Sequence, residues 1–239
     1  MRVVIILLSI FSFFQVDGQN LSAQQIIDLC IEEHGGDKYK NAHFSFDFRK
    51  HKYEYHYDNG VFKYIRKSKE GTTVDVLTND GFTRTENGKK VDLTEKKERS
   101  YSNSINSVNY FVFLPYFLND EAVNKRLLGE VEIKGAPYYK IEVTFDEEGG
   151  GDDHDDVYIY WISKYHFTMD YLAYSYQVNG GGVRFRSFKS RTKVGGIIFQ
   201  DYVNYKHDKS TPVEDMDRLF NEGKLEELSW IETNNIEKL

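Results

Sequence analysis

Hydrophobic and polar residues alternate with a period of two along much of this 239-residue chain. Between residues 43 and 49, Phe44, Phe46 and Phe48 alternate with polar residues, and tyrosines do the same between 53 and 58. Successive side chains of a strand point to opposite faces, so this period indicates strands with one buried face. The Asn59-Gly60 dipeptide that follows favours a tight hairpin. Turn signals then delimit further predicted strands at residues 61–66, 72–78, 82–86 and 89–93.

The same period returns after Gly129 and continues almost to the end of the chain. Glycine-rich turns separate the segments, and strands joined by short loops pair as antiparallel neighbours. We predict strands at residues 130–134, 138–145, 157–163, 168–177, 183–190 and 197–205, with a closing strand near 228–233. Residues 19–239 are therefore predicted to form a single domain that is mainly β (α+β), an antiparallel sheet with a few helices.

Three predicted helices interrupt the strands. Ser22 and Gln25 have the spacing of a capping box, and a helical apolar stripe continues to His34 before Gly35 ends it. A polar helical stretch begins near residue 94 and should end near 114, because a proline follows. Pro212 can open a third helix in the C-terminal tail.

Residues 111–118 form a continuous apolar run interrupted only by Pro115. A run this apolar and aromatic is unstable in water. We therefore expect the segment either to plug the concave side of the sheet or to close its mouth. In both arrangements its side chains lie near any ligand that the sheet encloses.

The first eighteen residues have the layout of a secretory signal peptide. Arg2 precedes an apolar run over residues 3–14, and compact residues stand just before Gln19. The run is shorter than the roughly 20 residues of a membrane span, which makes an uncleaved anchor the less favoured alternative. Cleavage after Gly18 predicts a soluble protein in the periplasm or outside the cell. Cys30 is the single cysteine, so an intramolecular disulfide is excluded.

Charge and composition narrow the class of partner. The formal net charge of −7 argues against nucleic acids and anionic lipid surfaces. The chain also contains 18 tyrosines and 17 phenylalanines, residues that favour pleated strands. Their rings form either a packed core or the lining of a ligand cavity.

A glycine-rich acidic loop is the densest polar group in the chain. It holds four carboxylates within five positions, those of Asp152, Asp153, Asp155 and Asp156. Ca²⁺ binds about six to eight oxygens, often in flexible loops, so these four are candidate metal ligands. Their spacing differs from that of an EF-hand, and a solvated turn is the plainer interpretation. No other cofactor is expected.

No recognisable catalytic motif is present. The chain lacks both the Gly-x-Ser-x-Gly elbow and the His-Glu-x-x-His zinc helix. Binding is therefore the favoured activity, while an enzyme stays open. Arg184 and Arg186 share a strand face with Phe188. They can hold the polar head of a ligand, pair with the acidic loop, or simply face solvent.

The order of these elements resembles the LolA-like and LppX-like carriers of bacterial envelopes. Residues 23–27 and the helix end at 34–36 are similar to that family's opening helix, and residues 158–162 and 169–172 to its paired central strands. The resemblance spans most of the mature chain and looks closer to an uncharacterised branch than to the lipoprotein carrier. It implies a strongly curved antiparallel sheet that forms an incomplete β-barrel, with helices over the open side and acyl chains bound between them.

Under this resemblance the ligand contacts are the aromatic strand faces and the apolar insertion. The leading hypothesis is a periplasmic or secreted, monomeric carrier or sensor of a hydrophobic, lipid-like ligand such as an acyl chain. The alternatives are a module that binds an envelope protein partner and, less favoured, a carboxylate-dependent hydrolase. The leading hypothesis requires space that the interior side chains leave unfilled. Its predicted ligand-binding residues are Phe44, Phe46, Phe48, Tyr53, Tyr55, Phe111, Phe113, Leu114, Phe117, Tyr158, Tyr160 and Tyr171.

Overall fold

The structure is a computed structural model that describes residues 21–151, 155–177 and 180–239. The predicted signal peptide, residues 1–18, lies outside the described residues. Within the described part the strands form two seven-stranded antiparallel sheets. The first sheet contains β1 (Asn41–Phe48), β2 (His51–Asp58), β3 (Val61–Ser68), β4 (Thr73–Thr78), β5 (Gly81–Glu86), β6 (Lys89–Lys90) and β14 (Thr233–Lys238). The second contains β7 (Val123–Ile133), β8 (Ala136–Phe145), β9 (Tyr158–Ser163), β10 (Met169–Tyr176), β11 (Gly182–Val194), β12 (Ile197–His207) and β13 (Glu226–Ile231).

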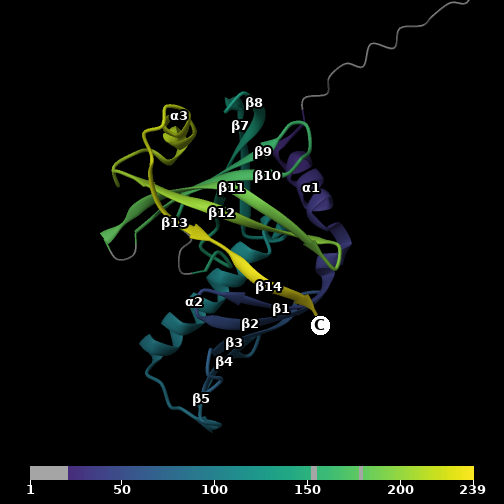
Figure 1. Ribbon diagram of the computed structural model, residues 1–239, viewed down its shortest axis with the longest axis vertical. Coiled ribbons are helices and arrows are strands. Elements are labelled where there is room, and N and C mark those ends of the chain that lie inside the picture. The colour runs from purple at the N-terminus through teal and green to yellow at the C-terminus, as the bar shows by residue number, and fades with distance from the viewer. Residues whose placement is uncertain (1–20, 152–154, 178–179) are drawn as a thin grey trace, which may run out of the picture.

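The helices lie between and beside these sheets (Figure 1). They are α1 (Ala23–His34), α2 (Glu95–Val112) and α3 (Met216–Asn221). Short 3₁₀ turns precede or follow them at η1 (Gly36–Lys40), η2 (Tyr116–Asn119) and η4 (Val213–Asp215). None of the described helices is long and apolar enough to cross a membrane.

The C-terminal segment joins the two sheets edge to edge. β13 pairs with β12 and β14 pairs with β1, and only Glu232 separates β13 from β14. Figure 1 shows this segment passing from one sheet to the other. In the described residues β6 and β7 stand at the outer edges and do not pair, so the barrel stays open. The predicted incomplete antiparallel barrel is confirmed, and it consists of two sheets.

Helix α1 covers one face of the second sheet. We call this face, on whose side α2 also lies, the inner face. Its side chains Ile26, Ile27 and Cys30 are fully buried and pack against apolar residues of β8, β9 and β10. The Ser22 hydroxyl accepts from the Gln25 N–H at 3.2 Å, and the Gln25 amide oxygen accepts from the Ser22 N–H at 2.9 Å. The predicted capping box is therefore confirmed.

Replacing the capping serine should have a measurable but moderate effect. We expect Ser22→Ala to lower the free energy of unfolding by about 1 kcal/mol, because an N–H of the first helical turn loses its acceptor. Urea unfolding followed by circular dichroism measures this change. Ser100→Ala, an exposed position inside α2, is the matched control and should be neutral or slightly stabilising. Equal losses in both variants would contradict the capping role.

Helix α2 lies against β3, β4 and β5 of the first sheet, and the apolar segment after it enters both cores. Phe113 and Phe117 pack in a cluster with the first sheet. Leu114 and Leu118 pack in a cluster with α1 and the second sheet. All four side chains are buried. The predicted burial of this segment is thus confirmed, and it fills the space where the two sheets meet.

The largest differences from the predicted strands concern β7 and β14, while β6 ends earlier than predicted, at Lys90, and β11 ends later, at Val194. β7 begins at Val123, well before residue 130, and β14 was not predicted. The first half of β7 does not alternate in sequence, since Lys125 precedes Arg126 and Leu127 precedes Leu128, and its register shifts between Leu127 and Gly129. β14 has a largely polar sequence and is stabilised by its ladder to β1 instead of by an apolar face.

Candidate functional site

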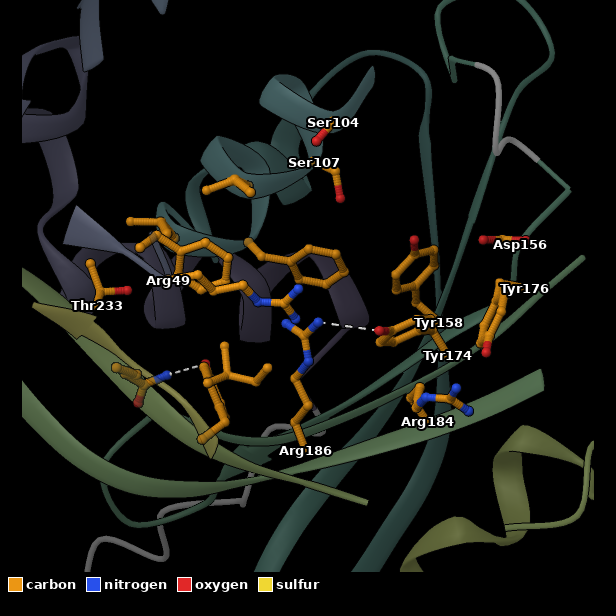
Figure 2. A pocket seen from close by; sticks show the side chains of 17 residues that line it. Arg49, Ser104, Ser107, Asp156, Tyr158, Tyr174, Tyr176, Arg184, Arg186 and Thr233 are labelled. Carbon is orange, nitrogen blue, oxygen red and sulfur yellow. Dashed lines mark hydrogen bonds between the residues drawn. The ribbon is translucent and has the colours of Figure 1, made fainter. Parts of the chain in front are cut away.

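A partly enclosed cavity of about 400 Å³ lies between α2 and the inner face of the second sheet. We call it the α2 pocket (Figure 2). Its volume falls within the roughly 300–1,000 Å³ typical of small-molecule sites. Helix α2 contributes one continuous face, made of Ser104, Ser107, Val108, Phe111 and Val112. The other lining residues are Phe48, Arg49, Asp156, Tyr158, Tyr174, Tyr176, Arg184, Arg186, Gln200, Tyr202, Ile231 and Thr233.

Aromatic rings form one wall of the α2 pocket. The rings of Tyr158 and Tyr174 are stacked with centroids 5.5 Å apart. Phe111 of α2 lies over the same pair, 6.4 Å from Tyr158 and 5.6 Å from Tyr174. Tyr176 extends this row along β10, 6.1 Å beyond Tyr174. These rings offer a rigid, largely apolar surface to a ligand.

Arginines also line the α2 pocket, and two of them lie against its aromatic rings. Arg184 and Arg186 project inward from β11, where the antiparallel register places them opposite Tyr174 and Leu172 of β10. Arg49 reaches the pocket from the two-residue turn between β1 and β2, where its φ is 55°. Three cationic groups therefore come from two elements that belong to different sheets.

Arg186 is the most buried of these arginines, with 8% of its surface exposed. Its Nη2 atom donates to the Tyr174 hydroxyl at 3.2 Å. The guanidinium carbon lies 4.1 Å from the centroid of the Phe111 ring, in a cation–π contact. Its Nε atom is buried and has no hydrogen-bond acceptor among the described residues. A buried donor without a protein acceptor is uncommon, and it is available to a ligand or a water molecule.

A buried ionic network fastens α2 to the first sheet. The Asp75 carboxylate accepts hydrogen bonds from Arg66 at 2.7 and 2.9 Å and from Arg84 at 2.6 and 2.9 Å. Arg66 also donates to Ser104 of α2 at 3.0 Å, and Arg84 lies 3.7 Å from the Tyr101 ring centroid. Burial opposes ionisation of Asp75, but the hydrogen bonds from Arg84 and Arg66 hold its pKa below the ordinary value. The helical wall of the pocket is thus fixed in place.

Most of the predicted ligand-binding residues pack against one another. The Phe113 ring lies 3.6 Å from the Tyr55 ring, centroid to centroid, in a stacked arrangement that occupies the space over the first sheet. Phe117 also borders a second cavity of about 310 Å³ beside α2. Leu114 and Tyr160 are buried in the cluster beneath α1. The buried cluster over the first sheet includes Phe44, Phe46, Tyr53, Tyr55, Phe113 and Phe117.

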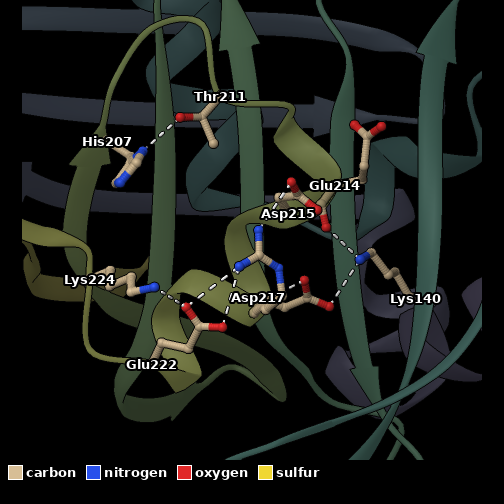
Figure 3. Close-up of polar contacts among 9 residues, drawn as sticks. Lys140, His207, Thr211, Glu214, Asp215, Asp217, Glu222 and Lys224 are labelled. Carbon is tan, nitrogen blue, oxygen red and sulfur yellow. Dashed lines mark hydrogen bonds and ion pairs between the residues drawn. The ribbon is translucent and has the colours of Figure 1, made fainter.

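Tyr171 lies on the other face of the second sheet, among the residues that α3 covers. The Lys140 ammonium donates to the Glu214 carbonyl at 2.6 Å and to the Asp217 carboxylate at 3.0 Å (Figure 3). The Trp161 indole N–H donates to the same carboxylate at 3.1 Å. These bonds hold α3 against the outer face, so Tyr171 is separated from the α2 pocket by the sheet.

The acidic loop is only partly described. Asp152 and Asp153 lie outside the described residues, and Asp155 is exposed. Asp156 is buried and lines the α2 pocket. In the described part of the chain no group of three or more His, Cys, Asp or Glu residues is arranged to hold a metal ion. The Ca²⁺ site at this loop stays a prediction.

Sequence reasoning identified part of this pocket. Phe48, Phe111 and Tyr158 were predicted ligand contacts and do line it. Tyr174 and Tyr176 were missed, although both have the same parity as Leu172 along β10 and so share its inner face. The pocket-lining serines of α2 could not be predicted, because a serine on a polar helix has the same sequence pattern as any solvent-facing residue.

Two solved structures share this fold. A LolA superfamily protein from Nitrosomonas europaea matches with a TM-score of 0.53 and 11% identity, covering 91% of this chain and 93% of that chain. A DUF1329 family protein from Desulfovibrio piger matches with a TM-score of 0.51 and 10% identity over the same shares. The lipoprotein LppX of Mycobacterium tuberculosis also matches, but its TM-score of 0.28 at 12% identity, over 65% of this chain and 87% of that chain, is too low to support a conclusion. The predicted LolA-like fold is confirmed.

The sequence comparisons agree with an uncharacterised branch of this fold. No curated protein matches the chain in sequence. A family model described as a family of unknown function, DUF6503, matches residues 2–233. Since this match covers nearly the whole chain, the protein belongs to the DUF6503 family.

Proposed function

We propose that this protein is a carrier or sensor of the bacterial envelope that binds a hydrophobic or amphipathic small molecule in the α2 pocket. The observation that carries the proposal is a cavity of about 400 Å³ whose walls are the aromatic rings of β9 and β10 and a firmly attached helix. Binding and release need no bond chemistry. The envelope location rests on the predicted signal peptide and on the fold shared with a LolA superfamily protein.

The size of the pocket favours a slender ligand. Its volume is at the lower end of the usual range for small-molecule sites, which suits a single chain or a small ring system. Each methylene group transferred from water to such a surface contributes about 0.8 kcal/mol. A chain of several methylene groups against Phe111, Tyr158 and Tyr174 would therefore bind with useful affinity before any polar contact is counted.

Blocking the α2 pocket should remove the ligand without unfolding the protein. Native mass spectrometry of gently purified protein is expected to show a co-purifying lipid-like mass. In Ser107→Trp the bound fraction should fall by about tenfold or more, because the indole occupies space on the pocket face of α2, one helical turn before Phe111. Ser100→Trp, on the same helix but outside the pocket, is the matched control and should retain the ligand.

Two outcomes would count against this proposal. Equal occupancy in the two tryptophan variants would place the ligand elsewhere. Consistent absence of any bound mass, together with recovery of a fixed protein partner, would instead favour the envelope interaction module.

A further inference from the structure

We infer that the ligand of the α2 pocket is an anionic amphiphile, a single apolar chain with a carboxylate or phosphate head, and that Arg186 and Arg49 hold this head. The inference rests on the proposed function and names the chemical class of its ligand. Arg186 differs from the other buried arginines of the protein in its charge partners.

The other arginines in buried surroundings have a carboxylate partner. Arg66 and Arg84 share Asp75, and Arg191 pairs with Asp170. Arg186 is as buried as Arg66, with 8% of its surface exposed in each case. Nevertheless, no carboxylate among the described residues lies within 4.0 Å of the guanidinium of Arg186, Arg184 or Arg49. Asp156 also lines the pocket but lies beyond this distance from the three guanidinium groups, so the buried charge of Arg186 has no carboxylate partner within reach and favours an anion.

The two guanidinium groups converge on the same space. Figure 2 shows the Arg49 and Arg186 side chains reaching toward one another from different elements. Like charges that face each other repel, and an anion between them converts this repulsion into attraction on both sides. The cation–π contact with Phe111 explains where the Arg186 plane lies, but it leaves the buried Nε atom without an acceptor. Carboxylate and phosphate oxygens match the fork of donors that a guanidinium presents.

The aromatic wall supplies the other half of the recognition. Phe111 lies over the Tyr158 and Tyr174 rings and also contacts the Arg186 guanidinium. A ligand whose head binds Arg186 would therefore have its chain against these three rings. A free anion would leave the rings unused, and an uncharged chain would leave the guanidinium groups uncompensated. An anionic amphiphile satisfies both parts of the pocket.

Matched ligands with the same chain test the inference. Decanoate, decyl phosphate and decanol compete with the uncharged fluorescent probe N-phenyl-1-naphthylamine near neutral pH. Wild-type protein should bind the two anions about tenfold or more tightly than decanol, because charge-assisted hydrogen bonds form with the head. Arg186→Gln should abolish this preference and leave decanol affinity within about twofold. Arg126→Gln, an exposed arginine outside the pocket, should change neither.

A second variant guards against a folding defect. Arg49 is exposed in a turn, so Arg49→Gln should fold normally and still reduce the anion preference several-fold. A stronger effect on decyl phosphate than on decanoate would identify the head as a phosphate, and the reverse a carboxylate. Inorganic phosphate alone should not displace the probe. If it displaced the probe at the same concentration as decyl phosphate, the inference that the ligand has an apolar chain would be overturned.

The outcomes separate the inference from the function on which it rests. Equal affinities of wild-type protein for all three decyl ligands would overturn the anionic head while leaving the pocket as a binding site. Failure of all three ligands and of the probe to bind would refute the proposed function itself. Equal weakening of decanol and decanoate by Arg186→Gln would show that Arg186 only supports the wall.

Discussion

Replacing Asp75 with asparagine should lower the free energy of unfolding by about 3–5 kcal/mol. The Asp75 carboxylate is 2% exposed and is the shared partner of Arg66 and Arg84. Asparagine keeps the shape but removes the negative charge, which leaves two guanidinium groups in poorly solvated surroundings. Urea unfolding monitored by tyrosine and tryptophan fluorescence measures the change.

A solvent-exposed ion pair provides the control for Asp75. Glu142 pairs with Arg126 at the surface, and Glu142→Gln should change stability by only about 0–1 kcal/mol. Because Arg66 also donates to Ser104, Asp75→Asn should in addition loosen α2 and weaken binding in the α2 pocket. Losses of similar size in the two variants would show that the buried network contributes no more than a surface pair.

Acid should destabilise the protein through His34. This side chain is fully buried at the end of α1, and its Nε2 atom accepts the backbone N–H of Met169 at 3.2 Å. Burial first, and then the positive charge of Arg191, lower the pKa of His34 to about 3. In the unfolded chain the imidazole takes up its proton near pH 6.5, so between about pH 6.5 and 3 the unfolded state binds more protons. Stability is therefore greatest above pH 6.5 and is lost as the pH falls toward 3.

The loss through His34 should reach on the order of 4 kcal/mol at the acid end of this window. Urea midpoints measured from pH 7 to pH 4 test it. The amide oxygen introduced by His34→Gln can still accept the Met169 N–H. The free energy of unfolding of this variant should fall less steeply as the pH drops, because unfolding takes up close to one proton fewer. His166→Gln, at an exposed position, should keep the wild-type pH dependence. If His34→Gln retained the full acid sensitivity, other groups would have to account for it.

The strands could be predicted from the sequence better than the packing of side chains between the two sheets. Alternation and the Asn59-Gly60 turn located β1, β2 and β3, because a two-residue period is a local property. The same alternation placed the rings of Phe44 and Tyr55 on a buried face. It could not distinguish core from cavity, since the Phe113 ring that occupies this space comes from a segment far along the chain.

The arginines show the same limit. Alternation put Arg184 and Arg186 on one face of β11, and both a ligand head and solvent were acceptable partners for that face. Whether this face meets a ligand or solvent depends on where α2 packs. Arg66 and Asp75 of the other sheet hold α2 in place. Neither the His34 contact with Met169 nor this docking leaves a local pattern, because each joins residues distant in sequence.

Because a single residue links β13 to β14, this C-terminal segment connects the two sheets. Until residues 226–238 are in place, β1 and β12 each present an unsatisfied row of backbone donors and acceptors. The hairpins within each sheet can form early, because they join strands close in sequence. The two sheets become connected only after residues 226–238 have paired with both. A chain interrupted before residue 226 would lack the strands that link the two sheets, so we expect the edges of β1 and β12 to be open to pairing with another molecule.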